Sequence, residues 1–252
     1  MFAIISDVHA NREALETVLA ELDGLKPERI VCLGDLVGYG PDPAWCVDTI
    51  RERCQIVIGG NHDLALVYGA RDFTESAGAT VRYHRQILMP RMDDSPEDEQ
   101  RVQRWNFLKA LPHRHEEDGR LFVHGSPRNP VSEYLRERDC KLGMMDKLSE
   151  NFALIPWVCF VGHTHQPGVI TGDLDFIRPE AAYRVEEGKK VIINVGSVGQ
   201  PRDKDPRASF VTVNWPEIQF LRVEYDLETT VRKLESTGGP DPNFPARLRA
   251  GV

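Results

Sequence analysis

Residues 1–25 read MFAIISDVHANREALETVLAELDGL, and this stretch decides the fold class. Residues 2–6 form a short, continuous apolar run, which is typical of a strand buried on both faces. Residues 11–25 then carry apolar side chains at helical spacing, namely Leu15, Val18, Leu19 and Leu22. Asn11 is a suitable N-cap for that helix. The chain therefore begins with a buried strand, a polar turn and an amphipathic helix.

The same pattern repeats directly downstream. Residues 29–33 are a second apolar run closed by glycine, and residues 43–53 predict a helix with proline at its start. Residues 55–58 predict a third short strand, followed by two glycines. This β-α-β-α-β alternation is typical of a layered α/β fold with parallel strands.

The strand signals pause after the third run. Residues 64–111 are rich in charge and predict helices, with a loop near 90–97. Further strands are predicted at 120–124, 157–161, 168–171, 190–195, 208–214 and 218–224, and further helices at 132–150 and 226–236. We therefore expect a single domain over residues 1–252, with a helical insertion at about 64–118. A tail from about residue 237, rich in glycine and proline, is expected to be poorly ordered.

The composition is that of a globular protein with a core of its own. The 252 residues are 41% hydrophobic and 28% charged, and the net charge is −8. An acidic chain argues against broad binding to long nucleic acid, which depends on phosphate neutralisation by Lys and Arg. The five cysteines form no CxxC pair, and no signal peptide or long apolar span is evident. We therefore expect a cytoplasmic protein with reduced thiols and no membrane partner.

Polar side chains with metal-binding chemistry follow five of the predicted strands. Active sites of open α/β sheets lie beyond the carboxyl ends of the strands, so these side chains are expected to meet. Seven of them are candidate metal ligands: Asp7, His9, Asp35, Asn61, His124, His163 and His165. The residues of each pair Asp7/His9 and His163/His165 are two apart, and in extended chain they point the same way.

Seven ligands are too many for one tetrahedral zinc and suit two metals that share a bridging carboxylate. Asp, His and Asn without Cys favour borderline or hard divalent ions. We expect two divalent metal ions as cofactors, with Mn as first choice and Fe, Zn, Ni, Co or Mg as alternatives. The alternative for these residues is ordinary capping and turn chemistry, which is common for Asp and Asn but does not explain the four histidines.

The ordered motifs resemble those of the calcineurin-like metallophosphoesterase superfamily, and of its small bacterial and archaeal phosphoesterase branch. The motifs are Asp7-x-His9, Gly34-Asp35, Gly60-Asn61-His62-Asp63, His124 and Gly162-His163-x-His165. The stretches 6–11, 34–40 and 194–202 add to the likeness, which continues to about residue 226. The resemblance implies an α/β fold that is a four-layer αββα sandwich, with two mixed β-sheets flanked by helices.

The resemblance also implies roles for the ligands. One metal would be held by Asp7, His9, Asp35 and His165, and a second by Asp35, Asn61, His124 and His163, with Asp35 bridging. Hydrolysis would then proceed by attack of metal-bound hydroxide on phosphorus. His62 resembles the histidine that faces the leaving group, as general acid or transition-state stabiliser. Asp63 is expected to orient His62, or else to cap the following helix.

Further candidate residues lie outside the ligand motifs. Asn11 and Arg202 are candidate substrate-binding residues, and Arg12, Arg128 and Asn194 are also near motifs. The alternative for Asn11 is helix capping, and for the arginines solvent-exposed ion pairing. His113 and His115 lie in a charged stretch that predicts a surface loop, and His84 is expected on a helix surface.

The predicted function is a dinuclear-metal phosphoesterase acting on a phosphodiester or phosphomonoester of a small molecule or nucleotide. One alternative is a catalytically silent metal-bound scaffold for a protein partner. The completeness of the ligand set argues against that, since a retired enzyme would be free to lose His62 or a ligand. A nuclease for long nucleic acid is disfavoured because the chain has no basic run. Oligomeric state is not indicated by any heptad or large apolar helix face.

Overall fold

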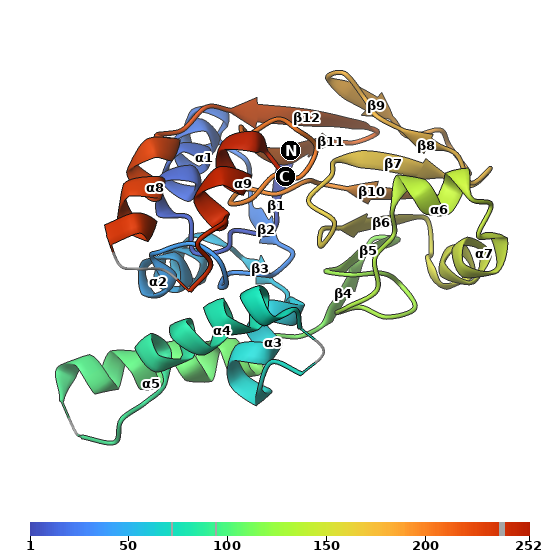
Figure 1. The fold of residues 1–252 in the computed structure, drawn as a ribbon. Helices are drawn as coiled ribbons and strands as arrows, with labels where there is room; N and C mark the ends of the chain where they lie inside the picture. The colour runs from blue at the N-terminus through green and yellow to red at the C-terminus, as the bar shows by residue number, and fades with distance from the viewer. Residues whose placement is uncertain (72, 94, 237–239) are drawn as a thin grey trace.

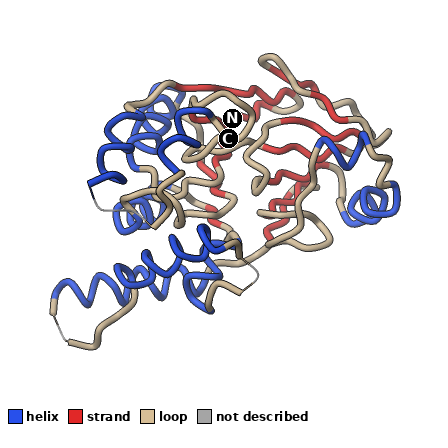
Figure 2. The backbone as a smooth tube through the Cα atoms, in the orientation of Figure 1, coloured by secondary structure: helices blue, strands red, loops and turns tan. Residues whose placement is uncertain are grey.

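Two mixed six-stranded sheets stack face to face, and helices cover their outer faces. The computed structural model describes residues 1–71, 73–93, 95–236 and 240–252. Figure 1 shows α1, α2, α8 and α9 on the outer side of one sheet and α6 and α7 on the outer side of the other. The strands fill the middle of the molecule, with the helices outside them (Figure 2). The four-layer αββα prediction is therefore confirmed.

The first sheet contains the predicted β-α-β-α-β unit. Its strand order is β3-β2-β1-β11-β12-β9, with β1, β2 and β3 parallel and the other neighbours antiparallel. Its strands are β1 (Phe2–Ile5), β2 (Ile30–Cys32), β3 (Ile56–Val57), β9 (Ala182–Arg184), β11 (Ala208–Asn214) and β12 (Glu217–Val223). Parallel pairing brings the carboxyl ends of β1, β2 and β3 to one edge, where Asp7, Asp35 and Asn61 follow.

The second sheet supplies the remaining strand ends. Its order is β4-β5-β6-β10-β7-β8, and β5, β6 and β10 run parallel. Its strands are β4 (Arg114–Glu117), β5 (Arg120–Val123), β6 (Val158–Val161), β7 (Gly168–Thr171), β8 (Phe176–Ile177) and β10 (Val191–Asn194). His124 and Gly162 follow β5 and β6 directly, so this sheet delivers histidines to the same edge.

The helices begin where the local sequence offers a cap or a proline. Asn11 accepts a hydrogen bond from the Ala14 amide at the start of α1, and Pro43 opens α2. The helices are α1 (Arg12–Leu25), α2 (Pro43–Arg53), α3 (Asn61–Tyr68), α4 (Glu75–Leu88), α5 (Pro96–Ala110), α6 (Glu137–Lys141), α7 (Met145–Leu154), α8 (Leu227–Ser236) and α9 (Phe244–Ala250). Helices α3, α4 and α5 occupy most of the predicted insertion and contact one another, and α4 and α5 also contact α2.

The alternation of side chains along the strands creates three apolar layers. In β1, Ala3 and Ile5 join the core beneath α1 and α2, whereas Phe2 and Ile4 join the core between the two sheets. A third core lies under α7, where Leu148 packs with strand residues of the second sheet. Every strand residue of β1 is therefore buried, which explains why its sequence is continuously apolar.

The structure departs from the sequence predictions at several places. Residues 114–117, expected in a surface loop, form strand β4, which pairs with β5 through a tight turn. Residues 237–239 of the predicted poorly ordered tail lie outside the described residues. The remainder of that tail is not disordered, because α9 forms and its Phe244 and Leu248 side chains are fully buried. The short strands β8 and β9 were also not predicted. The assignment of the chain to one domain stays a prediction.

The sequence predicts reduced thiols and no membrane-spanning segment. All five cysteines are unpaired, and four of them are buried. Within the described residues, none of the helices has both the length and the apolar character needed to cross a membrane.

Phe244 tests whether the last helix is part of the folded core. It is fully buried and stacks on Tyr39 with ring centroids 5.3 Å apart. We expect Phe244→Ala to lower the free energy of unfolding by about 3 kcal/mol, since it removes a buried aromatic ring. Urea unfolding measures that loss, and limited proteolysis should cut the variant before residue 244.

Phe244→Leu is the matched control, because it keeps most of the apolar volume and should cost only about 1 kcal/mol. A Phe244→Ala protein with the protease resistance and unfolding curve of the parent would contradict the docking of α9.

Candidate metal centre

The seven candidate ligands converge at the shared edge of the two sheets. Asp7 and His9 follow β1, Asp35 follows β2, Asn61 begins α3, His124 follows β5, and His163 and His165 follow β6. Six of them form two groups, in each of which the ligand atoms lie within 4.8 Å of one another. Asp35 belongs to both groups, and all six side chains are buried. The prediction that these strand ends meet is therefore confirmed.

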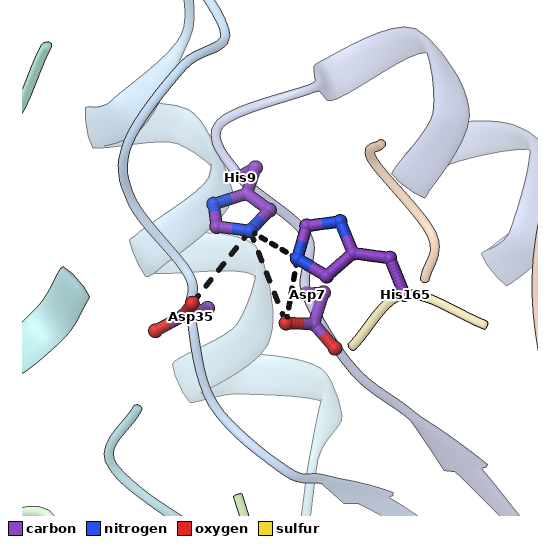
Figure 3. Close-up of side chains that lie close together, drawn as sticks. All are labelled: Asp7, His9, Asp35 and His165. Atoms are coloured by element: carbon purple, nitrogen blue, oxygen red, sulfur yellow. Dashed lines mark hydrogen bonds and ion pairs between the residues drawn. The ribbon is translucent and has the colours of Figure 1, made fainter. Parts of the chain in front are cut away.

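The first group contains Asp7, His9, Asp35 and His165, and Figure 3 shows their side chains turned toward a common centre. His9 Nε2 and His165 Nε2 are 3.1 Å apart. His9 Nε2 lies 3.6 Å from Asp35 Oδ2, and His165 Nε2 lies 3.2 Å from Asp7 Oδ1. Two imidazoles and two carboxylates thus point at one small volume.

The second group lies on the other side of Asp35. His124 Nε2 is 3.4 Å from Asp35 Oδ2 and 3.1 Å from His163 Nδ1. The same nitrogen is 3.1 Å from Asn61 Oδ1. Asn61 thereby joins the second group, as the sequence predicted.

Each of the four histidines is anchored to a backbone carbonyl through the nitrogen that faces away from the centre. His9, His124 and His165 use Nδ1, which lies 2.9, 2.9 and 2.5 Å from the carbonyl oxygens of Val37, Leu33 and Gln200. His163 uses Nε2, at 3.1 Å from the carbonyl oxygen of Ser132. A carbonyl oxygen only accepts, so these nitrogens carry the protons, and the opposite nitrogens present lone pairs to the centre.

This tautomer assignment tests whether the site fits a cation. Lone pairs of His9 and His165 face each other across 3.1 Å, and such a contact repels; the contact between His124 and His163 would repel in the same way if both rings were neutral. Asp7 Oδ1 is also buried without a hydrogen-bond donor. A proton relieves one such contact, whereas a divalent cation relieves several at once. The nitrogen and oxygen donors therefore fit divalent cations of borderline or hard character.

The electrostatics keep His9, His165 and Asp35 in the forms that bind metals, whereas His124 holds a proton. Burial lowers the pKa of His9 and His165 well below the ordinary value, so both rings stay neutral. Burial opposes charge on Asp35, but the nearby His124 and His62 outweigh it and lower the pKa of its carboxyl group. Burial likewise opposes charge on His124, yet Asp35 raises its pKa to about 9. A cation at this position would have to displace that proton.

The backbone at the ligands is strained. Asp7, His9, Asp35, His163 and His165 all have positive φ, between 48° and 63°. Non-glycine residues rarely adopt this region, and such strain is concentrated at functional sites. The expectation that each Asp/His or His/His pair converges because the chain is extended is therefore wrong. The pairs converge because left-handed residues curl the chain after β1 and β6.

Glycines make room for the carboxylates. A Cβ atom added to Gly60 would lie 2.1 Å from Asp35 Oδ1, and one added to Gly162 would lie 2.6 Å from Asp7 Oδ2. Residues 34–40 also turn around Asp35 as expected, with Gly34 at φ +97°.

His62 borders a cavity of about 740 Å³ beside the cluster. Its ring centroid lies 4.8 Å from that of His9 and 4.9 Å from those of Tyr39 and Phe73. Nδ1 is buried without a hydrogen-bond partner, against Gly38, so Nε2 is the nitrogen available to the cavity. Burial lowers the pKa of His62 to about 4. The ring is thus held beside the cluster by packing.

Asp63 does not orient His62. Its Oδ1 accepts hydrogen bonds from the Leu36 and Val37 amides, and its Oδ2 accepts one from the Gly60 amide. The carboxylate therefore caps α3 and fixes the loop that carries Asp35. Of the two sequence interpretations, the capping one describes the structure, and the catalytic assignment is corrected.

Asn11 does not face the cavity either. Its side chain is fully buried, Nδ2 donates to the Gly199 carbonyl and to Tyr225, and Oδ1 accepts from Ala14 and Thr230. With every polar atom engaged, Asn11 is a structural cap and not a substrate-binding residue. Arg202, by contrast, borders the cavity and donates to Gln200 Oε1 at 2.8 Å.

The three further residues near motifs have other partners. Arg12 forms an exposed ion pair with Glu16, and Arg128 pairs with Glu133 and Glu150. Asn194 donates to the Gly162 carbonyl and thereby supports the loop of His163.

His84 is not a surface residue. It is 1% exposed, accepts a hydrogen bond from the Gly38 amide at Nδ1 and donates from Nε2 to the Gly40 carbonyl. It thus buttresses the loop after Asp35 from helix α4. Its burial depends on how α4 docks, which helical periodicity alone does not reveal. His113 is exposed, whereas His115 is half-buried in β4 beside Glu117.

Three cavity residues were not predicted. Tyr39 follows the Asp35 motif, Tyr134 stacks on His163 with centroids 3.7 Å apart, and Arg247 comes from α9. Of these three residues, only Tyr39 lies in a stretch that carries the family resemblance, residues 34–40. Tyr134 lies in a loop and Arg247 in the predicted tail, where no strand-end pattern draws attention to them.

A sequence model described as the calcineurin-like phosphoesterase superfamily domain matches residues 1–216. The chain is also 32% identical over 250 residues to protein MJ0912 of Methanocaldococcus jannaschii, covering 96% of this chain and 94% of that protein.

Two solved structures share the fold over the whole chain. A metallophosphoesterase from Sphaerobacter thermophilus is 34% identical, with a TM-score of 0.82 over 100% of this chain and 98% of the other. Protein PH1004 of Pyrococcus horikoshii is 19% identical, with a TM-score of 0.72 over 100% and 99% of the two chains. The second likeness concerns the fold alone.

His84 predicts a pH dependence of stability. Burial lowers its pKa from 6.5 to about 4, so the unfolded chain takes up this proton at higher pH than the folded chain does. Stability from the neutral ring is therefore complete above pH 6.5 and is lost as pH falls toward about 4. The full effect is on the order of 3 kcal/mol.

Urea unfolding of the parent and of His84→Gln from about pH 7.5 to about pH 5 measures the contribution of His84 to the free energy of unfolding. We expect the gap in unfolding free energy between them to narrow as pH falls. His113→Gln, at an exposed histidine, is the control and should follow the parent. A constant gap for His84→Gln would contradict the assignment.

Proposed function

The chain belongs to the calcineurin-like phosphoesterase superfamily, and from this membership and the geometry of the cluster we propose that it hydrolyses phosphate esters of small molecules or nucleotides with the help of two divalent metal ions. The observation that carries the proposal is the set of four histidines, each tied to a backbone carbonyl by one nitrogen and turned toward shared carboxylates by the other.

The ligands divide into two sets that share Asp35. One ion would be held by Asp7, His9, Asp35 and His165, and the other by Asp35, Asn61, His124 and His163. Divalent ions at these positions would activate water near neutral pH and offset negative charge on the phosphate. Mn²⁺ is our first choice, and Fe, Zn, Ni, Co or Mg would suit the same donors.

The protein's own groups would complete the site. His62, held at the cavity by His9, Tyr39 and Phe73, would donate a hydrogen bond or a proton from Nε2 to the leaving oxygen. Arg202 borders the same cavity and would bind a phosphate oxygen that is not attacked.

The cavity favours a small substrate. Its volume of about 740 Å³ is that of a pocket for a small molecule. Helix α3 and residues 73–77 form one wall, and residues 131–134 form another. The insertion therefore limits access for large protein substrates, and the net charge of −8 disfavours long nucleic acid.

Activity tests the reaction class. We expect metal-stripped protein reloaded with Mn²⁺ to hydrolyse bis-p-nitrophenyl phosphate, p-nitrophenyl phosphate or both, and their ratio ranks diester against monoester chemistry. His62→Ala should lower kcat by about 100-fold, since it removes the proposed donor to the leaving oxygen, while it leaves every metal ligand in place.

His113→Ala is the matched control and should keep full activity. Absence of turnover with Mn²⁺, Ni²⁺, Co²⁺, Zn²⁺ and Mg²⁺, in protein that has bound metal, would count against hydrolysis of these esters and favour the scaffold alternative.

Metal content tests the two-ion arrangement without any assay of turnover. Equilibrium dialysis followed by elemental analysis should give two Mn²⁺ per chain for the parent. His165→Ala and His163→Ala should each weaken the binding of one ion. Asp35→Asn should weaken the binding of both ions, because Asp35 is shared. Glu16→Gln, at an exposed carboxylate, should change nothing. A single ion per chain in the parent would refute the dinuclear proposal.

A further inference from the structure

The cavity beside the metal cluster is positively charged, although the chain as a whole is acidic. Among the described residues that line it, the charged ones are Arg71, Arg202 and Arg247, with no aspartate or glutamate. The net charge of the chain is −8, so this sign reversal is local. A cavity lined by one sign of charge attracts the opposite sign, here an anion.

Arg202 is poorly neutralised for a partly buried guanidinium. Its NH2 donates to Gln200 Oε1 at 2.8 Å and to the Tyr39 hydroxyl at 3.3 Å, which are both neutral acceptors. Its Nε is buried without any acceptor. Within the part of the chain that the structure describes, no carboxylate pairs with it. A buried donor of this kind is satisfied when an anion arrives.

Arg247 reaches the same cavity from the last helix. Its guanidinium carbon and that of Arg202 each lie 5.6 Å from the centroid of the Tyr39 ring, so they are separated by at most twice that distance. Arg247 faces Asp241 only at 3.5 Å, at the limit of a hydrogen bond. Residue 247 lies beyond the part of the chain that the family model matches, residues 1–216.

Helix α9 is held firmly enough to position Arg247. Phe244 stacks on Tyr39, and the Val252 carbonyl accepts a hydrogen bond from Gln200. The Lys204 amide donates to the Gly251 carbonyl. These contacts tie the end of the chain to the loop that carries Arg202, and Figure 1 shows α9 beside α8 with the C-terminus close to this loop.

The two arginines reach the cavity from different elements. The Arg202 amide donates a hydrogen bond to the carbonyl of the candidate ligand His165, so Arg202 stands directly beside the metal cluster. Arg247 approaches Tyr39 from α9 and is about one-third exposed. Arg202 is therefore placed to bind the phosphate at the cluster, and Arg247 is available to a second anion.

We infer that Arg247, together with Arg202, selects phosphate esters whose organic part carries a second anionic group, a phosphate or a carboxylate. This inference rests on the proposed function, since it takes the first phosphate to lie at the metal cluster. The rest of the cavity lining is mainly apolar, with Leu64, Tyr68, Phe73, Val131 and Tyr134. The segment that joins the two anions is therefore uncharged.

Binding of phosphonates, which cannot be hydrolysed, tests this inference in Mn²⁺-loaded full-length protein. The probes are ω-carboxyalkylphosphonates with about two to six methylene groups, each compared with its ω-carbamoyl counterpart of equal length. For at least one length we expect calorimetry to show the carboxylate binding about tenfold tighter than the amide. In Arg247→Met the ratio of the two affinities should fall to about one, and Arg247→Lys should retain part of the preference because it keeps the charge.

Arg249→Met is the matched control, because Arg249 lies two residues further on α9, is exposed and pairs with Glu228. It should keep the preference of the parent, and thermal unfolding of all three variants reports whether α9 stays folded. The inference is overturned if the parent shows no preference at any length, or if Arg247→Met retains it. If the parent prefers the carboxylate probe over the amide probe but does not hydrolyse p-nitrophenyl esters, the proposed hydrolysis is refuted and the role of Arg247 remains.

Discussion

Negative charge buried at the junction of two sheets is the constraint on which the rest of this structure depends. Asp7 and Asp35 are at most 1% exposed, and ring nitrogens of four histidines lie around them. An uncompensated buried carboxylate costs several kcal/mol, so this arrangement persists only if protons or cations neutralise it. The sheets supply the rigidity that holds the charges together, and divalent cations are the natural source of compensation.

Backbone hydrogen bonds hold the ligand loops in their strained conformations. The Asp7 amide donates to the Gly34 carbonyl, the His9 amide to the Asp35 carbonyl, and the Gly199 amide back to the Asp7 carbonyl. Asp63 adds a carboxylate that accepts from three amides around Asp35. Each loop is therefore fixed by its neighbours, so left-handed φ values costing of order 1 kcal/mol each are tolerated at five ligands. The backbone hydrogen bonds thus contribute to holding the ligand side chains in place.

The sequence was sufficient for most of the strands and for the convergence of the candidate ligands because both signals are local. A run such as Phe2–Ile5 is apolar because both its faces are buried, and His124 stands out because it directly follows such a run. Local sequence patterns did not predict the roles of side chains whose positions depend on tertiary contacts. Burial of His84 depends on the docking of α4, and Asp63 turns to distant amides instead of the adjacent His62. Helix α9 was missed because its glycine- and proline-rich approach suggests disorder, whereas Phe244 and Leu248 find buried partners.

Tyr39 connects the metal cluster to the helices that lie around the cavity. Its ring contacts His9 and His62 on the cluster side and Phe244 of α9 on the other, and it belongs to a small core with Ala77 of α4. The ends of the sheet strands carry six of the seven candidate ligands, and the seventh, Asn61, begins α3. Helices α4 and α9 both line the cavity beside them, and α4 also supports the loop of Asp35 through His84. If the chain acts as proposed, the strand ends would determine the reaction class and the helices that meet at Tyr39 would determine the choice of substrate.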